Sequence, residues 1–291
     1  MKILLTGADG FTGVHFTQAA QAAGHQVVPL RADLTQAQAL REEVAAVQPE
    51  AVVHLAGIAF VGHADDAAFY AVNTVGTATL LGALYALPTA PSKVLIASSA
   101  NVYGNCPASP ITEEAPLAPT NHYAASKMAM EAMARTYAEQ LPLVIARPFN
   151  YTGVGQSESF LIPKLVSHFA RKAQSVELGN LEVEREFNSV AMVCDAYLQL
   201  LHHGAPGATY NVCSGVMHSL RSVLALLEDI TNHKMHAHVN PRFVRKSEVL
   251  QLCGSPAKLN ALLQRHQQAT PKNDLRSTLE GMLQAMKRQT C

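Results

Sequence analysis

The sequence contains few charged residues, and their signs balance. Asp, Glu, Lys and Arg make up 15% of the 291 residues, with 22 basic and 22 acidic side chains, so the formal net charge is zero. No basic excess attracts nucleic acid or an anionic membrane surface, and binding of an anion must come from a few placed residues. Hydrophobic residues make up 48%, which indicates a packed globular protein and argues against disorder.

The sequence also lacks the patterns that mark metal sites and disulfide scaffolds. Its five cysteines lie far apart without a CxxC pair, and its 13 histidines include no HExxH pattern. We therefore expect reduced thiols, a cytoplasmic location and no bound metal.

Uninterrupted hydrophobic runs of the membrane-spanning kind are missing as well. The N-terminus starts a strand at Lys2, which leaves no room for a signal peptide. Residues 67–92 contain no charged side chain, but Gly76, Gly82 and Pro88 interrupt them. We interpret this stretch as a helix that is buried or faces a second subunit, and we expect no membrane partner.

The first half alternates short apolar runs with helical patterns. This alternation predicts right-handed crossovers and an α/β fold with a doubly wound parallel Rossmann sheet, which binds ligands at the carboxyl ends of its strands. The expected strands are 2–6, 26–30, 51–56, 93–98, 143–147 and 209–212, and the expected helices are 12–23, 35–46, 66–86, 123–140 and 163–171. We assign residues 1–151 and 187–213 to a dinucleotide-binding domain, and residues 152–186 and 214–291 to a smaller α/β lobe that binds the substrate.

The loop after the first expected strand reads TGADGFTG, residues 6–13. Glycines permit a sharp turn and a close approach of backbone N–H groups to a pyrophosphate, and the following helix N-terminus adds partial positive charge. The GxxGxxG spacing departs from the usual GxGxxG, and Arg31 follows the second strand where an NAD enzyme has an acidic residue. An arginine there suits the 2′-phosphate of NADP, so the sequence favours NADP(H) and leaves NAD(H) possible.

Tyr123 and Lys127 form a YxxxK pattern on an expected helix. A spacing of four places both side chains on one helix face, and the lysine cation favours the phenolate and lowers the tyrosine pKa. The tyrosine can then exchange a proton with a substrate oxygen near neutral pH. Ser99 follows another strand end, where its hydroxyl can bind the same oxygen.

These motifs, in this order, resemble the extended short-chain dehydrogenase/reductase superfamily, in its branch of nucleotide-sugar epimerases, dehydratases and reductases. The resemblance spans essentially the whole chain and includes NTVGT at 73–77, SSANVYG at 98–104, RPFN at 147–150, REF at 185–187 and YNVCSG at 210–215. It implies Ser99, Tyr123 and Lys127 as catalytic residues. It implies cofactor contacts from Gly7, Asp9, Gly10, Phe11, Thr12, Gly13, Arg31, Asp33, Leu34, Leu55, Ala56, Gly57, Asn73, Ala97, Tyr123 and Lys127.

The resemblance also implies contacts with a nucleotide-sugar substrate. Arg185 and Arg245 match arginines that hold the diphosphate, and Glu248 stands where GDP-sugar enzymes hold the guanosine ribose, although Lys246 replaces the usual proline of that pattern. A GDP-sugar is therefore the favoured substrate. The implied substrate-binding residues are Ser99, Asn101, Asn150, Arg185, Arg245 and Glu248.

Asn101 argues against dehydration. Dehydratases of the branch carry an acidic residue, usually Glu, two positions after the catalytic Ser or Thr, and an amide cannot do general acid–base work. The segments 147–160 and 196–215 are similar to reductases of GDP-4-keto-6-deoxy sugars. We predict NAD(P)H-dependent reduction of the 4-keto group of a GDP-4-keto-6-deoxyhexose, giving GDP-D-rhamnose or a related GDP-6-deoxyhexose.

Two alternatives stay open. One is a nucleotide-sugar 4-epimerase with tightly bound NAD, and the other is a nucleotide-binding regulator without catalysis. A homodimer that pairs through the uncharged helix of residues 67–92 and the helix of Tyr123 is also predicted, because members of this superfamily commonly dimerise through these helices.

Overall fold

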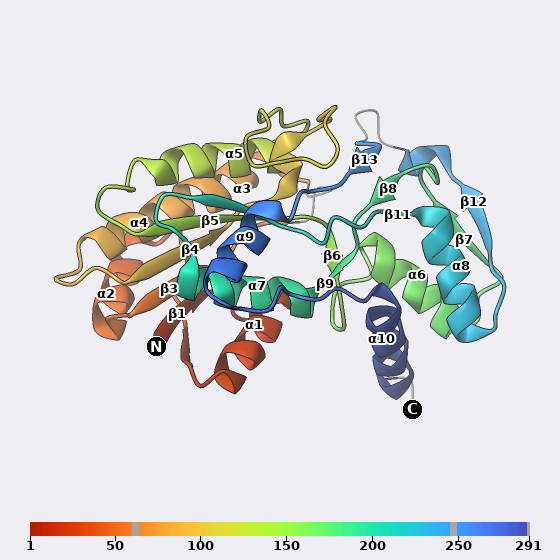
Figure 1. Ribbon diagram of the computed structural model, residues 1–291, viewed down its shortest axis with the longest axis horizontal. Coiled ribbons are helices and arrows are strands. Elements are labelled where there is room, and N and C mark those ends of the chain that lie inside the picture. Colours follow the sequence, from red (N-terminus) through yellow and green to blue (C-terminus); the bar gives the residue numbers. More distant parts are fainter. Residues whose placement is uncertain (60–63, 245–248, 290–291) are drawn as a thin grey trace.

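The apolar runs of the first half form one parallel sheet in the computed structural model, which describes residues 1–59, 64–244 and 249–289 (Figure 1). The strands lie in the order β10-β5-β4-β3-β1-β2, and every neighbouring pair is parallel. The predicted doubly wound Rossmann fold is confirmed. The strands are β1 Lys2–Thr6, β2 Gln26–Pro29, β3 Ala51–His54, β4 Lys93–Ala97, β5 Leu143–Pro148 and β10 Thr209–Val212.

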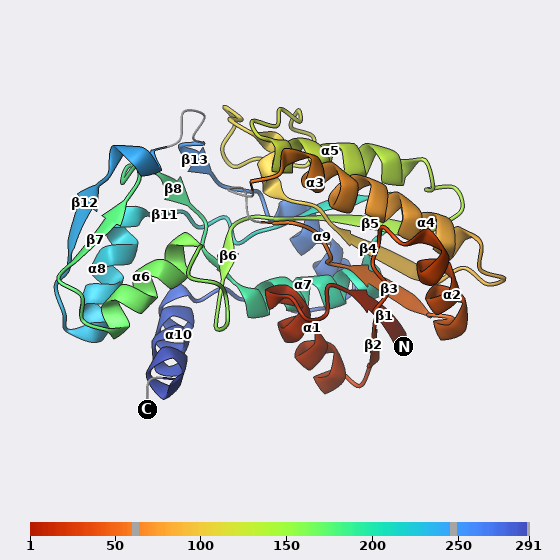
Figure 2. The same cartoon turned by 180° about the vertical axis from the view of Figure 1, so that it is seen from behind.

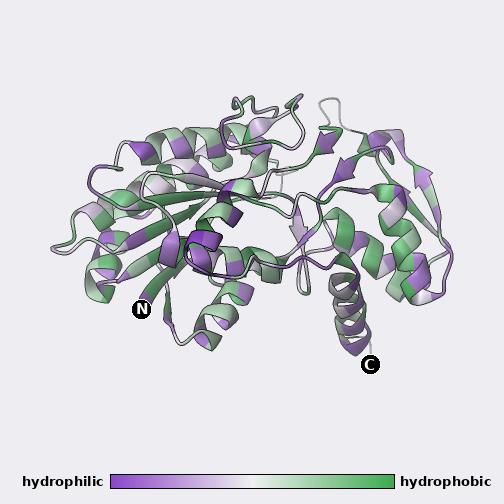
Figure 3. Cartoon of the chain, viewed as in Figure 1, coloured by the Kyte–Doolittle hydropathy of each residue, from purple (hydrophilic) through white to green (hydrophobic). Residues whose placement is uncertain are grey.

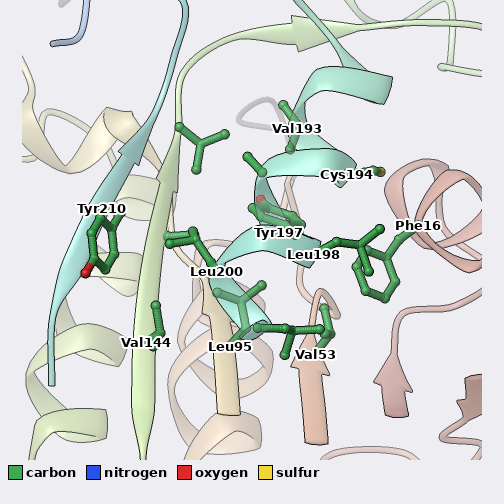
Figure 4. Packing of buried hydrophobic residues seen from close by; sticks show 14 of the residues in the cluster. Phe16, Val53, Leu95, Val144, Val193, Cys194, Tyr197, Leu198, Leu200 and Tyr210 are labelled. Atoms are coloured by element: carbon green, nitrogen blue, oxygen red, sulfur yellow. The ribbon is translucent and has the colours of Figure 1, made fainter. Parts of the chain in front are cut away.

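Helices cover both faces of this sheet (Figures 1 and 2), and their buried side chains form a separate apolar cluster on each face. Because both faces are buried, the central strands are almost wholly hydrophobic (Figure 3). Figure 4 shows one face, where Val53 and Leu95 of the sheet pack near Phe16 and Leu200 of the helices. One face carries α1 Phe11–Ala22, α7 Val190–His203 and α9 Ala257–Arg265, and the other carries α2 Ala37–Val47, α4 Thr77–Tyr85 and α5 His122–Arg135.

The uncharged helix expected over 66–86 is continuous but not uniform. It begins as α3 (Asp66–Phe69), widens into the π-helical stretch η1 (Tyr70–Gly76) and continues as α4. Among the described residues it is the one helix long and apolar enough to span a membrane, with a mean hydropathy of 1.3, and 44% of that stretch is buried within the protein. The leucines of α4 lie in the sheet core, so packing against the sheet accounts for much of its apolar character.

The smaller lobe has its own apolar core and two small sheets (Figure 1). In one sheet β7 pairs with β12, and in the other β8 lies between β11 and β13. A short pair, β6 with β9, lies where the chain passes between the two parts. The bounds are β6 Tyr151–Thr152, α6 Leu161–Ala170, β7 Ser175–Leu178, β8 Glu184–Arg185, β9 Asn188–Ser189, β11 His218–Ser219, α8 Leu220–Thr231, β12 His236–Val239, η3 Pro241–Phe243, β13 Gln251–Leu252 and α10 Leu275–Gln289.

Helix α9 belongs to the segment 214–291 of the expected smaller lobe, but it packs against the large sheet. The leucines of α9 belong to the same apolar cluster as Tyr210 and Val212 of β10. Strand β10 is the edge of the large sheet, and α9 covers its apolar side chains. The chain therefore returns to the large domain before it ends in α10, which packs in the smaller lobe.

Candidate active site

A cavity of about 860 Å³ lies between the carboxyl ends of the sheet strands and the smaller lobe. It brings together residues that are far apart in the sequence and that were predicted to work together. From the predicted cofactor set, the walls include Gly7, Gly10, Phe11, Thr12, Gly13, Leu55, Gly57, Ala97, Tyr123 and Lys127. From the predicted substrate set, they include Ser99, Asn101, Asn150 and Arg185.

The glycine-rich loop forms a backbone cradle at one end of this cavity. Gly7 has a φ of 69°, and a Cβ atom there would lie 2.8 Å from the backbone nitrogen of Ala56. A Cβ atom at Gly13 would lie 2.0 Å from the carbonyl oxygen of Gly7. Helix α1 begins directly after Gly10, which gives it no side-chain cap. Because first-turn N–H groups have no partner within a helix, the cradle fits the pyrophosphate of a dinucleotide.

Six predicted cofactor residues do not line the cavity: Asp9, Arg31, Asp33, Leu34, Ala56 and Asn73. Asn73 is fully buried, and its side-chain amide binds the backbone of Ile58 and the hydroxyl of Ser126, so it holds the wall in place from behind. Leu34 lies in the core of the sheet, and Asp33 is occupied by hydrogen bonds from Thr35. Sequence motifs mark these positions but do not say which way their side chains point.

Arg31 and Asp9 form an exposed ion pair beyond the loop. The Nη1 atom of Arg31 donates to the Oδ2 atom of Asp9 at 3.0 Å, and the two side chains are 67% and 85% exposed. Asp9 belongs to the glycine-rich loop and Arg31 follows β2. A 2′-phosphate bound at Arg31 would therefore compete with the carboxylate of Asp9 for the guanidinium.

We predict that the Arg31–Asp9 pair sets cofactor selectivity. Arg31→Ala should weaken NADPH binding about tenfold and leave NADH binding nearly unchanged, since a guanidinium–phosphate hydrogen bond is charge-assisted. Asp9→Asn should shift the ratio of the two dissociation constants toward NADPH. Fluorescence titration with both cofactors measures these ratios, with exposed Arg41→Ala as the control. Equal weakening of NADH and NADPH by Arg31→Ala would contradict a contact with the 2′-phosphate.

Tyr123 and Lys127 lie on one face of α5, as their spacing predicts. The side chain of Asn121 caps this helix by accepting a hydrogen bond from the backbone N–H of Ala124, which places Tyr123 in the first turn. Both side chains are almost fully buried. The ammonium of Lys127 donates to the carbonyl oxygen of Ala97 at 2.9 Å, so the end of β4 fixes its position.

The tyrosine pKa differs in direction from the sequence-based expectation. Burial raises the pKa of Tyr123, and a hydrogen bond from Ser99 lowers it to a smaller extent. Burial lowers the pKa of Lys127 to about 8, and the charge of Glu131 raises it. The expectation considered only the lysine cation, whereas removal of the phenol from water disfavours the phenolate. Tyr123 is therefore protonated at neutral pH, which is the form that a proton donor needs.

Three of the predicted substrate residues, Asn101, Asn150 and Arg185, line the cavity. Asn101 lies on η2 (Ala100–Tyr103), where its backbone N–H donates to Ser99, and Asn150 follows β5. The guanidinium of Arg185 donates to the carbonyl oxygens of Val249 and Leu250. The predicted residues Arg245 and Glu248 lie outside the described residues.

Sequence reasoning did not single out several residues of the cavity wall. Tyr151 binds the hydroxyl of Thr12 at 2.8 Å, and Asn180 and Phe243 come from the smaller lobe. Tyr197 of α7 is fully buried, and its hydroxyl has no hydrogen-bond partner within the described part of the chain (Figure 4). The glycine–asparagine pair at 179–180 is a turn signal that could have been used. Tyr197 has the helical spacing of an ordinary core residue and gives no such signal.

The chain matches a family of known enzymes over most of its length. The model of the family described as GDP-mannose 4,6 dehydratase matches residues 20–278. A GDP-6-deoxy-D-mannose reductase of Pseudomonas aeruginosa is 37% identical over 96% of this chain and 96% of its own length. A GDP-6-deoxy-D-talose 4-dehydrogenase of Aggregatibacter actinomycetemcomitans is 35% identical over 89% of this chain and 90% of its own.

Solved structures agree with this match. RMD from Pseudomonas aeruginosa, determined in complex with NADPH, is 34% identical over 99% of this chain and 98% of its own, with a TM-score of 0.90. A protein from Burkholderia cenocepacia J2315, whose assignment as an epimerase is itself provisional, is 44% identical over 99% of this chain and 98% of its own, with a TM-score of 0.92. The predicted superfamily and branch are confirmed.

Proposed function

The chain belongs to the GDP-mannose 4,6 dehydratase family, and from this membership we propose that it is an oxidoreductase that reduces the 4-keto group of a GDP-4-keto-6-deoxyhexose with NADPH. The two curated relatives described above are named for a reductase and for a 4-dehydrogenase of GDP-6-deoxyhexoses. These names describe hydride transfer at a sugar carbon in opposite directions. The relative solved with NADPH supports NADP(H) as the favoured cofactor, with NAD(H) possible.

The observation that carries the proposal is the composition of the wall around Tyr123. Ser99, Tyr123 and Lys127 line the cavity beside the glycine-rich loop. Together, the loop and these three residues provide the cofactor site and the proton donor that a hydride-transfer reaction needs. Asn101 lines the same wall at the position where the dehydratases of the branch carry an acid. Loss of water from a sugar needs that additional acid–base group, and reduction does not.

Each residue of this wall has a distinct role in the proposed reduction. When bound, reduced nicotinamide supplies the hydride that the ketone carbon receives. Tyr123 gives its hydroxyl proton to the ketone oxygen, so the carbonyl becomes an alcohol and one phenolate remains. The ammonium of Lys127 stabilises that phenolate, and the hydroxyl of Ser99 orients the oxygen. On the substrate side, Arg185 and Asn150 are proposed to contact the diphosphate and the sugar, together with Arg245 and Glu248.

A turnover screen with purified protein tests the function. GDP-4-keto-6-deoxymannose should be reduced with consumption of NADPH, and the 4-keto sugars of other nucleotides should react more slowly. An absence of NADPH oxidation with every 4-keto sugar nucleotide would overturn the proposal. Interconversion of 4-hydroxy nucleotide sugars without added cofactor would identify the 4-epimerase instead, and binding without any turnover would identify the regulator.

We further propose a cytoplasmic homodimer that binds neither nucleic acid nor membrane. Helix stretch 66–85 and α5 pack beside each other, and Val75 and Tyr85 of this stretch are each 59% exposed. Sedimentation should give the mass of two chains, and Val75→Glu should shift the equilibrium toward one chain because it places a charge in the interface. A wild-type protein that sediments only as a single chain would contradict the dimer.

A further inference from the structure

A fully buried carboxylate, Glu131, lies one helical turn beyond Lys127 on α5. Tyr123, Lys127 and Glu131 are spaced by four residues, so they share one helix face. The side chain of Glu131 has no exposed surface. It is farther from the cavity than the other two and does not line it, so it does not touch the substrate directly.

Glu131 ties the catalytic helix to the strand end that carries Ser99. The hydroxyl of Ser98 donates to the Oε1 atom of Glu131 at 2.6 Å. One residue earlier, the carbonyl oxygen of Ala97 accepts from Lys127 at 2.9 Å. Two successive residues of the β4 end are thus bound to two successive turns of α5. Ser99 is the next residue, so these two hydrogen bonds determine where its hydroxyl lies relative to Tyr123.

The negative charge of Glu131 is held by arginines on the side away from the cavity. Arg147 of β5 donates through Nε to Oε1 at 2.9 Å and through Nη2 to Oε2 at 2.6 Å. Arg135 adds a contact of 3.2 Å from the solvent side. Burial opposes ionisation, but the hydrogen bonds and charge of Arg147 outweigh it, and the pKa of Glu131 lies below its usual value. Glu131 is therefore an anion at neutral pH.

The other titratable groups around this cluster do not replace that anion. His54 of β3 faces Lys127, but burial holds its pKa at about 3, so it is neutral. Tyr103 accepts from Arg147 and stays protonated, because burial raises its pKa to about 12. Glu113 contacts Arg147 only through its backbone carbonyl. Glu131 is the acidic group whose charge raises the pKa of Lys127.

We propose that Glu131 is a positioning residue of the active site, whose carboxylate places a negative charge one helical turn from Lys127 and fixes the strand end that carries Ser99. The kinetic part of this inference rests on the proposed reduction. The structural part rests on the hydrogen bonds of Ser98, Lys127 and Arg147 and holds for any chemistry that uses Tyr123 and Lys127.

The pH profile of kcat tests the charge of Glu131. In Glu131→Gln, the loss of activity on the alkaline side should begin at lower pH, and kcat near pH 8 should fall about tenfold, because Lys127 loses its proton more easily. Glu131→Asp keeps the charge, so its alkaline limb should stay in place while kcat falls through misplacement. Exposed Glu139→Gln removes the same charge outside the site and controls for net charge. An unmoved alkaline limb in Glu131→Gln would overturn the charge effect.

Two further measurements test the inference, and the first of them does not require that Glu131→Gln folds. Ser98→Ala leaves the ion pair intact and should lower kcat about tenfold without moving the alkaline limb or the KM for NADPH; wild-type kcat in this variant would overturn the positioning effect. Lysine side-chain NMR, with the Lys127 signal assigned by Lys127→Met, should show that Lys127 loses its proton at lower pH in Glu131→Gln than in the wild type, and at an unchanged pH in Glu131→Asp. An unchanged titration in Glu131→Gln would contradict the charge effect.

The NMR titration separates the two proposals. It needs no substrate, so it reports on Glu131 even if no 4-keto sugar nucleotide is reduced. A failed turnover screen would contradict the proposed reduction but not the proposed role of Glu131.

Discussion

Tyr123→Phe is expected to lower kcat for the reduction of the 4-keto sugar nucleotide about a thousandfold, because it removes the hydroxyl that donates the transferred proton in the proposed reaction. The phenyl ring fills the same space, so the fold and NADPH binding should stay close to wild type. Steady-state kinetics gives kcat, and fluorescence titration gives the NADPH affinity.

Tyr85→Phe is the matched control for this substitution. It removes the same hydroxyl from a side chain that does not line the cavity and is exposed in the single chain, and it should leave kcat unchanged. If Tyr123→Phe retained more than about a tenth of wild-type kcat, another group would have to be the proton donor.

Arg147→Met is expected to destabilise the fold by about 3–5 kcal/mol, because it leaves the carboxylate of Glu131 buried without its main partner. Arg147 is only 3% exposed, and it also donates to Tyr103 at 2.8 Å. The loss should appear as a lower midpoint of urea unfolding with little change in the slope.

The double variant Arg147→Met/Glu131→Leu should recover much of this loss, since both buried charges are then gone. Recovery on addition of the second substitution is the signature of a coupled pair. If the two single losses simply added in the double variant, the ion pair would not be the cause.

The sequence predicted those features that depend on local pattern. The alternation of apolar runs and helical patterns predicted the sheet and its helices, since each strand and helix is determined by a short stretch of chain. The spacing of Tyr123 and Lys127 placed them on one face of α5, and the glycines of residues 7–13 predicted a turn that approaches neighbouring backbone closely. All three features appear in the structure.

Features that depend on distant partners were not predictable in the same way. Glu131 looks like an ordinary helix residue, and only the fold brings Ser98 and Arg147 to it from two strands. The direction of the Tyr123 pKa follows from how deeply the phenol is buried, which the YxxxK spacing does not contain. Asn73 and Leu34 carry family motifs but point into the interior. Helix α9 returns to the large domain and covers the apolar side chains of β10. The order of elements in the sequence does not show that β10 lies at the edge of the sheet.

The late position of β10 in the chain has a consequence for biosynthesis. A ribosome makes the N-terminal part first, and domains fold as units once their residues have emerged. Here the sixth strand and its covering helix α9 emerge only after residues 152–186 of the other lobe have been made. Until then β5 is an open edge, to which a strand of another nascent chain can add. The edge of β5 is therefore open to pairing in the interval between the synthesis of β5 and that of β10.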